Sequence, residues 1–149
     1  MMITKPEAQY NLVDWWKKVV RDNYANFDGR ARRAEYWYFA LANFLINIGL
    51  YLLFFLLAFS GILAFMSIGV IFLLIVYAVA MIIPTLAVLV RRLHDTDKSG
   101  WFALLGLIPI GNIILFVFTC IEGTHGTNQY GSDPKITTDF INEIGTKEY

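Results

Sequence analysis

The longest uncharged stretch of the sequence runs from Tyr36 to Val90 and contains no Asp, Glu, Lys or Arg. At about 1.5 Å of rise per residue, a single helix over this stretch would be far longer than the roughly 30 Å hydrocarbon core of a bilayer. Two antiparallel membrane spans joined by a short apolar turn account for the stretch. Glycine and serine cluster between Ser60 and Gly69, so we predict the turn there, with helices over about 36–59 and 69–90.

A third uncharged run, from Trp101 to Ile121, is long enough for one further crossing. Pro109 and Gly111 interrupt its centre, because proline removes a backbone donor and glycine weakens a helix. A kinked span and a re-entrant hairpin both fit, and we prefer the span because each half alone is too short to cross. The predicted fold is an all-α membrane protein, a small bundle of three transmembrane helices whose third helix (about 101–121) is kinked or re-entrant at Pro109.

An amphipathic helix is predicted ahead of the spans, from Asn11 to Phe27. Apolar and aromatic residues gather on one side of it and Asp, Lys and Arg on the other, with Asn11 as the cap. This pattern is typical of a helix lying in the membrane interface. Such a helix either senses lipid or a partner, or steadies the bundle. We therefore divide the chain into an N-terminal amphipathic interfacial segment (1–28), a transmembrane domain (29–134) and a polar C-terminal tail (135–149).

The distribution of basic residues predicts an orientation. A two-helix hairpin returns the chain to the side it left, so ten of the twelve Lys and Arg residues share one side of the membrane. The positive-inside rule makes that side the cytoplasm, with the N-terminus and the 91–100 loop on it. If the third run spans, the side of the C-terminus is the opposite one. The formal net charge is zero, which gives no basis for binding nucleic acid.

Two arginine clusters flank the predicted hairpin and are the candidate sites for anions or lipid headgroups. They consist of Arg30, Arg32, Arg33, Arg91 and Arg92. We expect Asp95 or Asp97 to pair with an arginine of the 30–33 segment and His94 to cap a carbonyl. Residues 97–101 are predicted to form a turn, with Trp101 in the aromatic belt. The full set of candidates for this network is Glu35, His94, Asp95, Asp97, Ser99, Trp101, Asn128 and Tyr130.

Few polar residues interrupt the predicted spans. Asn43 and Asn47 share one helix face with Tyr51, either as hydrogen-bonding links between helices or as the lining of a polar path. Pro84 is expected to kink the second helix, with the hydroxyl of Thr85 helping to satisfy the freed carbonyls.

The glycine-rich segment, the cysteine and the histidines do not form a recognisable set of catalytic residues. The glycine-rich segment 122–134 is either a compact polar turn or an anion nest. Cys120 is the only cysteine and the two histidines lack metal-ligand spacing, so we expect no metal and no cofactor, and we assign no catalytic residue.

Several segments together resemble one known family. They are Phe27 to Trp37 (FDGRARRAEYW), Arg91 to Trp101 (RRLHDTDKSGW), Ile108-Pro109, and Glu122 to Pro134. In this order they resemble the small bacterial inner-membrane proteins grouped as domain of unknown function 805 (DUF805). The resemblance implies an inner-membrane protein with a few helices, and it implies no particular activity.

Three functions are compatible with these features. The first is a non-enzymatic accessory or scaffold protein, acting as a homo-oligomer or with a membrane-protein partner in an envelope complex. The second is a small oligomeric transporter or channel. The third is a protein that binds or acts on phospholipid headgroups, anionic ones in particular, through the arginines.

Overall fold

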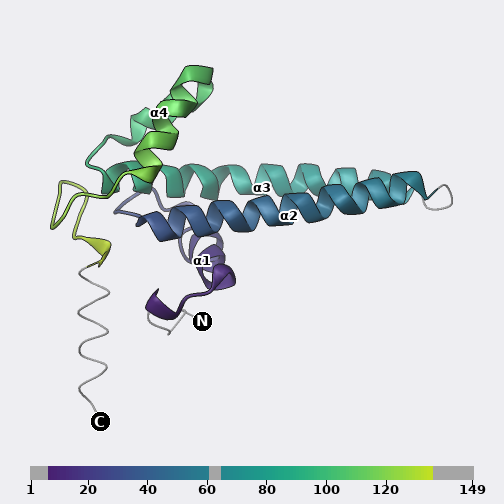
Figure 1. Cartoon of the computed structure of the whole chain (residues 1–149), viewed down its shortest axis with the longest axis horizontal. Coiled ribbons are helices and arrows are strands. Elements are labelled where there is room, and N and C mark those ends of the chain that lie inside the picture. Colours follow the sequence, from purple (N-terminus) through teal and green to yellow (C-terminus); the bar gives the residue numbers. More distant parts are fainter. Residues whose placement is uncertain (1–6, 61–64, 136–149) are drawn as a thin grey trace, which may run out of the picture.

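Residues 7–60 and 65–135, the part of the chain that the computed structural model describes, form helices and connecting loops. The regular elements are η1 (Glu7–Gln9), α1 (Leu12–Lys17), the π-helix η2 (Lys18–Asp22), α2 (Arg33–Phe59), α3 (Met66–Asp95), the 3-10 helix η3 (Gly100–Leu107) and α4 (Pro109–Cys120). α2 and α3 lie side by side as a long hairpin, with α1 against one flank and α4 rising from the other (Figure 1). An isolated bridge joins Asn128 to Gly131.

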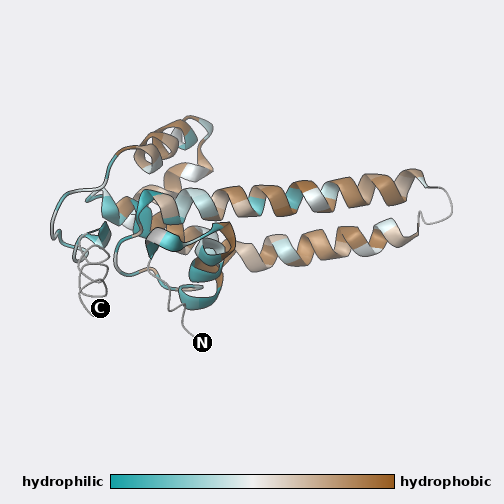
Figure 2. Cartoon of the chain, turned by 60° about the horizontal axis from the view of Figure 1, so that its bottom comes forward, coloured by the Kyte–Doolittle hydropathy of each residue, from teal (hydrophilic) through white to brown (hydrophobic). Residues whose placement is uncertain are grey.

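The two long helices are those that the uncharged stretch predicts. α2 has 27 residues and α3 has 30, and both are long and apolar enough to cross a membrane. At about 1.5 Å per residue they measure roughly 40–45 Å, which exceeds the hydrocarbon core. Polar residues gather at the end where the N-terminal helices pack, and the opposite end is apolar (Figure 2). The predicted turn at 60–69 falls partly on residues 61–64, which lie outside the described residues.

α3 differs from its predicted bounds of 69–90, because it begins at Met66 and runs through both arginines to Asp95. It ends in a Schellman motif, in which Lys98 N donates to Leu93 O at 3.0 Å and Asp97 N to His94 O at 3.0 Å. Asp97 has the positive φ of 57° that this motif requires. The predicted turn over residues 97–101 therefore begins at Asp97.

The run from Trp101 to Ile121 folds as a hairpin, which corrects our preference for a kinked span. η3 runs away from the polar end of α3, Ile108 N donates to Leu105 O at 3.0 Å, and α4 returns. Pro109 lies at the start of α4, where its missing N–H costs nothing. Gly111 allows the return, because a Cβ there would overlap the carbonyl oxygen of Leu105. Both ends of the run therefore lie at the same end of α3.

The N-terminal helix begins at its predicted cap. Asn11 and Asp14 form a capping box, with Asp14 N donating to Asn11 Oδ1 at 2.9 Å. The helix continues as η2 and ends at Asp22, earlier than the predicted Phe27. Its apolar side is buried against the hairpin, since Trp15 and Val19 are 3% and 0% exposed. This segment packs on α2 and α3.

α3 continues through Pro84 without interruption. The carbonyl that the proline frees is that of Ala80, and it accepts a hydrogen bond from the hydroxyl of Tyr24. Within the described residues Thr85 makes no such bond, so our prediction for its hydroxyl was wrong.

Candidate functional site

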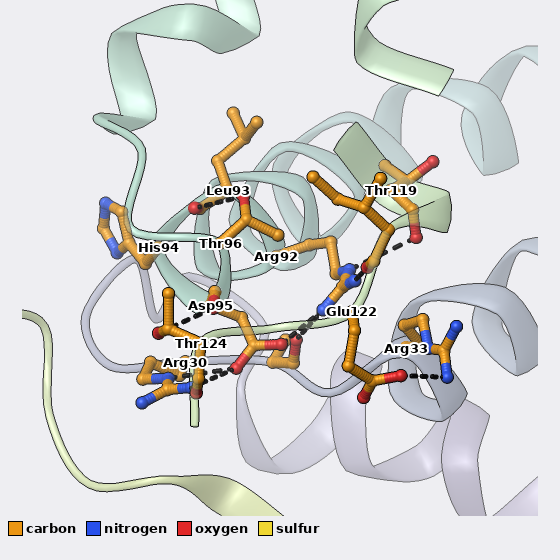
Figure 3. A network of polar contacts seen from close by, with 12 residues as sticks. Arg30, Arg33, Arg92, Leu93, His94, Asp95, Thr96, Thr119, Glu122 and Thr124 are labelled. Atoms are coloured by element: carbon orange, nitrogen blue, oxygen red, sulfur yellow. Dashed lines mark hydrogen bonds and ion pairs between the residues drawn. The ribbon is translucent and has the colours of Figure 1, made fainter. Parts of the chain in front are cut away.

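The charged residues of the two arginine clusters meet at the polar end of the α2–α3 hairpin. The loop before α2 carries Arg30, and the last turns of α3 carry Arg91 and Arg92. The segment after α4, with Glu122 and Thr124, passes over Arg30 and Arg92 (Figure 3). Arg92 is 0% exposed and Glu35 is 1% exposed. Burial of so many charges is costly unless each is paired, so the geometry of the pairs decides what this end can do.

Asp95 is the centre of the first cluster. Its Oδ1 accepts from Nε of Arg30 at 3.0 Å and also pairs with Nη2 at 3.0 Å. Its Oδ2 pairs with Nη1 of Arg92, one helical turn earlier on α3. The structure thus contains the predicted pair between Asp95 and the 30–33 segment, with a second arginine on the other carboxylate oxygen. Gly123 leaves room for this carboxylate, because a Cβ there would overlap it.

Backbone carbonyls occupy the remaining donors of these two guanidinium groups. Arg92 donates to the carbonyls of Thr119, at 3.3 Å, and of Ile121, which are left open at the C-terminal end of α4. Arg30 donates to Gly126 O at 2.6 Å and to Thr124 O at 2.5 Å. The two arginines therefore fasten α4 and the glycine-rich segment to the end of α3.

Glu35 is the centre of the second cluster. Its Oε1 accepts from Nη1 of Arg91 at 2.5 Å, and its Oε2 lies 2.7 Å from Nζ of Lys18. Lys18 also contacts Glu7, at 2.5 Å, and Glu7 contacts Arg32 at 3.0 Å. This chain of charges ties the N-terminal helices to α2 and α3.

The charges of this cluster are unequally satisfied. Burial alone would lower the pKa of Lys18, but the carboxylates of Glu35 and Glu7 outweigh it and raise that pKa. In Arg91, Nε and Nη2 are buried and have no hydrogen-bond partner within residues 7–60 and 65–135.

His94 is held in one orientation. Its Nδ1 lies 3.2 Å from the carbonyl oxygen of Gly29, so Nδ1 carries the proton. Its ring stacks on Tyr130 with centroids 3.8 Å apart and planes within 2°. Asn128 supports this contact, donating to His94 O at 2.9 Å and accepting from Tyr130 N at 2.9 Å. His94 thus caps a carbonyl, as the sequence predicted.

The other candidate residues lie at separate places. Arg33 is half-exposed and pairs with Glu122 and with the carbonyl of Cys120. Asp97 accepts from Gln129 at 3.2 Å, and Ser99 accepts from Trp101 N at 3.4 Å. Trp101 itself is 79% exposed.

The two asparagines of α2 lie far from the polar end. Asn43 Oδ1 accepts from the hydroxyl of Tyr77 at 2.5 Å, which links α2 to α3. Asn47 donates to the carbonyl of Asn43 at 2.8 Å. The pair therefore joins helices at one point and follows a helix backbone at the other.

Sequence reasoning missed two groups that hold this end together. Glu7 and Lys18 were not candidates, although Lys18 lies on the polar face of the predicted amphipathic helix and Glu7 shortly precedes that helix. The backbone carbonyls of residues 119–126 that accept hydrogen bonds from Arg30 and Arg92 were also not predicted, because a sequence carries no signal for a backbone acceptor. Within the described residues, no group of three or more His, Cys, Asp or Glu side chains is placed to hold a metal ion.

Comparison with known proteins gives consistent matches. The family model described as "Protein of unknown function (DUF805)" matches residues 24–132. The "Inner membrane protein YhaH" of Escherichia coli strain K12 is 46% identical over 125 residues, or 83% of this chain and 98% of that protein. The "Inner membrane protein YhaI" of the same strain is 42% identical over 124 residues, or 83% of this chain and 97% of that protein. No solved structure matches the chain significantly.

Proposed function

Because the chain belongs to the DUF805 family, whose matched relatives are inner-membrane proteins, we propose that it is a non-enzymatic accessory or scaffold protein that acts as a homo-oligomer in that membrane. The polar end, which carries the N-terminal helices and the arginine clusters, lies on the cytoplasmic side in this proposal. The α2–α3 hairpin crosses the bilayer and supplies the surface for the second copy.

The pairing of the charged residues supports a structural role for the polar end. Arg30 and Arg92 donate to carboxylates and carbonyls of the chain itself. Arg91 is engaged by Glu35 and is 3% exposed. At Arg30 and Arg92, a headgroup would have to displace these partners. This weakens the alternative in which the arginines bind anionic phospholipids.

The observation that supports the proposed homo-oligomer is a pair of polar side chains on the outer surface of α2. Tyr51 is 54% exposed, and its hydroxyl has no hydrogen-bond partner in the described part of the chain. Asn47, one turn earlier, uses its amide nitrogen on a backbone carbonyl, and its side-chain oxygen is left without a partner in the same part. A donor and an acceptor therefore lie side by side on one helix face.

The depth of these groups makes their exposure costly. Tyr51 precedes the last residue of α2 by eight positions, about 12 Å at 1.5 Å per residue. Asn47 is a further turn inward, close to the middle of a hydrocarbon core of roughly 30 Å. Neither side chain reaches water from there, and polar groups without partners are unfavourable in hydrocarbon.

A second copy in the same orientation satisfies both groups. Side chains on a helix point towards its N-terminus, so the hydroxyl of Tyr51 reaches back to the level of Asn47. In a two-fold symmetric pair, each Tyr51 hydroxyl donates to Asn47 Oδ1 of the other copy. Two such bonds contribute together about 1–3 kcal/mol within a membrane.

Disulfide crosslinking in native membranes tests the proposal. Phe44 is 60% exposed and lies two turns before Tyr51 on the same face, whereas Leu45 is 49% exposed at almost the same depth on another face. In a Cys120→Ser background, Phe44→Cys should form dimers on mild oxidation and Leu45→Cys should not. Adding Tyr51→Phe to Phe44→Cys should weaken dimerisation roughly 5- to 150-fold.

Two results would count against the proposal. Equal crosslinking at Phe44→Cys and Leu45→Cys would indicate random collision in the bilayer. If the protein stays monomeric in mild detergent and gives no crosslink in membranes, the proposed homo-oligomer is contradicted.

A further inference from the structure

A groove runs along α3 beside η3, separate from the proposed dimer face of α2. Its volume is about 510 Å³, within the range of small-molecule sites. Its lining includes Leu86 and Val90 of α3, Trp101 and Leu104 of the η3 segment, and the side chains of His94 and Tyr130. Leu86 and His94 are eight residues apart, so the groove extends about 12 Å from the polar end towards the apolar part of the hairpin.

His94 presents one free acceptor to this groove. The residue is 9% exposed, and its Nδ1 proton is used on the carbonyl of Gly29. Nε2 therefore carries the lone pair, and it has no partner within residues 7–60 and 65–135. Gly100 keeps this atom uncovered, because a Cβ there would lie 3.3 Å from Nε2 and 2.7 Å from Cγ1 of Val90.

The ring cannot turn away from the groove. Tyr130 stacks on one face, and the turn that carries Tyr130 is fixed to the end of α3 by the bond from Asn128 to His94 O. An imidazole with one nitrogen fixed by a carbonyl and the other directed at an apolar groove is preorganised to accept a hydrogen bond from a ligand.

The lining selects the charge of the ligand. No Arg, Lys, Asp or Glu contributes to the wall of this groove. A phosphate headgroup would be left without a counter-charge there, whereas an uncharged hydroxyl needs only the acceptor.

We propose that this groove binds a neutral long-chain lipid alcohol of the diacylglycerol type, whose free hydroxyl donates to Nε2 of His94 while an acyl chain lies along Val90 and Leu86. The site is independent of the homo-oligomer proposed above.

Photolabelling of the full-length protein tests this site. The protein is placed in nanodiscs of phosphatidylcholine that contain a diacylglycerol with a diazirine on one acyl chain, and adducts are mapped by mass spectrometry. We expect adducts on residues of α3 and η3 that line the groove. Unlabelled 1,2-dioleoylglycerol should compete for them, and its methyl ether, which cannot donate a hydrogen bond, should compete about 2- to 12-fold less well.

Two variants separate the hydroxyl contact from the shape of the groove. His94→Asn keeps a donor near the carbonyl of Gly29 but removes the acceptor at the Nε2 position, and it should erase the difference between the alcohol and its ether. Leu104→Trp fills the groove without altering His94, and it should reduce labelling by the diazirine diacylglycerol. Circular dichroism and gel filtration check that each variant is folded.

Three results would overturn the proposal. The first is equal competition by the alcohol and its ether in the wild-type protein. The second is stronger labelling by a diazirine phosphatidylglycerol than by the diacylglycerol. The third is adducts that join two copies of the chain through this groove, which would make it a protein interface.

Discussion

Tyr24 donates its hydroxyl hydrogen to the carbonyl oxygen of Ala80 at 2.6 Å, bridging the N-terminal segment and the middle of α3. In a regular helix the amide of residue 84 would occupy that carbonyl, but residue 84 is proline. Pro84 is fully buried and the hydrogen bond itself is partly buried, so the access of water to this carbonyl is restricted. The N-terminal segment thus completes the hydrogen bonding of a helix that is long and apolar enough to cross a membrane.

Replacement of Tyr24 by Phe should therefore destabilise the protein by about 1–2 kcal/mol, because it leaves a partly buried carbonyl without a donor. In a Pro84→Ala background the helix regains its own amide, so the same replacement should cost much less. Thermal unfolding in detergent of the four combinations measures this coupling. Tyr38→Phe is the control, since the hydroxyl of Tyr38 has no hydrogen bond in the described part of the chain. Equal losses in both backgrounds would show that Tyr24 acts in another way.

The hairpin of η3 and α4 shows where sequence reasoning about the fold reached its limit. The uncharged stretch predicted α2 and α3 because burial in lipid requires closed backbone hydrogen bonding. Pro109 fits both the middle of a kinked helix and the first position of a new one. The choice between them depends on tertiary contacts, namely the approach of Gly111 to Leu105 and the capture of the last carbonyls of α4 by Arg92.

Gly111→Ala should open this hairpin, because the added Cβ would overlap the carbonyl of Leu105. Gly106→Ala is a matched control in the same hairpin, where the new Cβ would meet Cδ1 of Leu115 at an ordinary 3.5 Å. We expect a loss of at least 1–3 kcal/mol for the first, as for other overpacked sites, and little change for the second. Thermal unfolding in detergent checks both, and similar losses would contradict the close approach.

The charged site at the polar end was only partly predictable from the sequence, because its ion pairs also depend on tertiary contacts. Sequence reasoning placed Arg91 and Arg92 together, but adjacent residues on a helix point about 100° apart. Arg91 faces Glu35 and the N-terminal helices, and Arg92 faces Asp95 and α4. The identity of the acid that pairs with each arginine follows from how four segments pack, which local patterns do not contain.

Removal of the charge of Asp95 tests whether the first cluster stabilises the fold. Asp95→Asn leaves Arg30 and Arg92 buried without a counter-charge, and breaking a buried network of this kind costs about 3–5 kcal/mol. The pair of Arg33 and Glu122 is the control, because their side chains are 46% and 38% exposed. Glu122→Gln should cost about 0–1 kcal/mol. Comparable losses in chemical unfolding would show that the buried cluster contributes no more than an exposed pair.

The hairpin also changes the expected topology. Since both ends of the 101–121 run lie beside the polar end of α3, the segment after α4 should lie on the same side of the membrane as the N-terminal helices, which we propose to be the cytoplasmic side. In a Cys120→Ser background, a membrane-impermeant maleimide should label Phe59→Cys in intact spheroplasts. It should label Gln129→Cys, an exposed position, only after permeabilisation. Labelling of Gln129→Cys in intact spheroplasts would contradict the hairpin and favour a kinked membrane span over residues 101–121.

The segment after α4 should detach from the polar end in acid. The carboxylate of Asp133 accepts from the amides of Gly126 at 3.1 Å and Lys135 at 2.9 Å. Burial would raise the pKa of Asp133, but these two donors and Arg30 outweigh it and hold the pKa below its usual value of 3.8. A folded pKa below the unfolded one means that the carboxylate stabilises the segment above pH 3.8 and that this contribution is lost as the pH falls through the folded pKa. A spin label at Gln129→Cys, in a Cys120→Ser background, should therefore become mobile below about pH 3.8. Asp133→Asn should raise its mobility at neutral pH and flatten the acid transition, whereas an unchanged transition would assign it to another carboxylate.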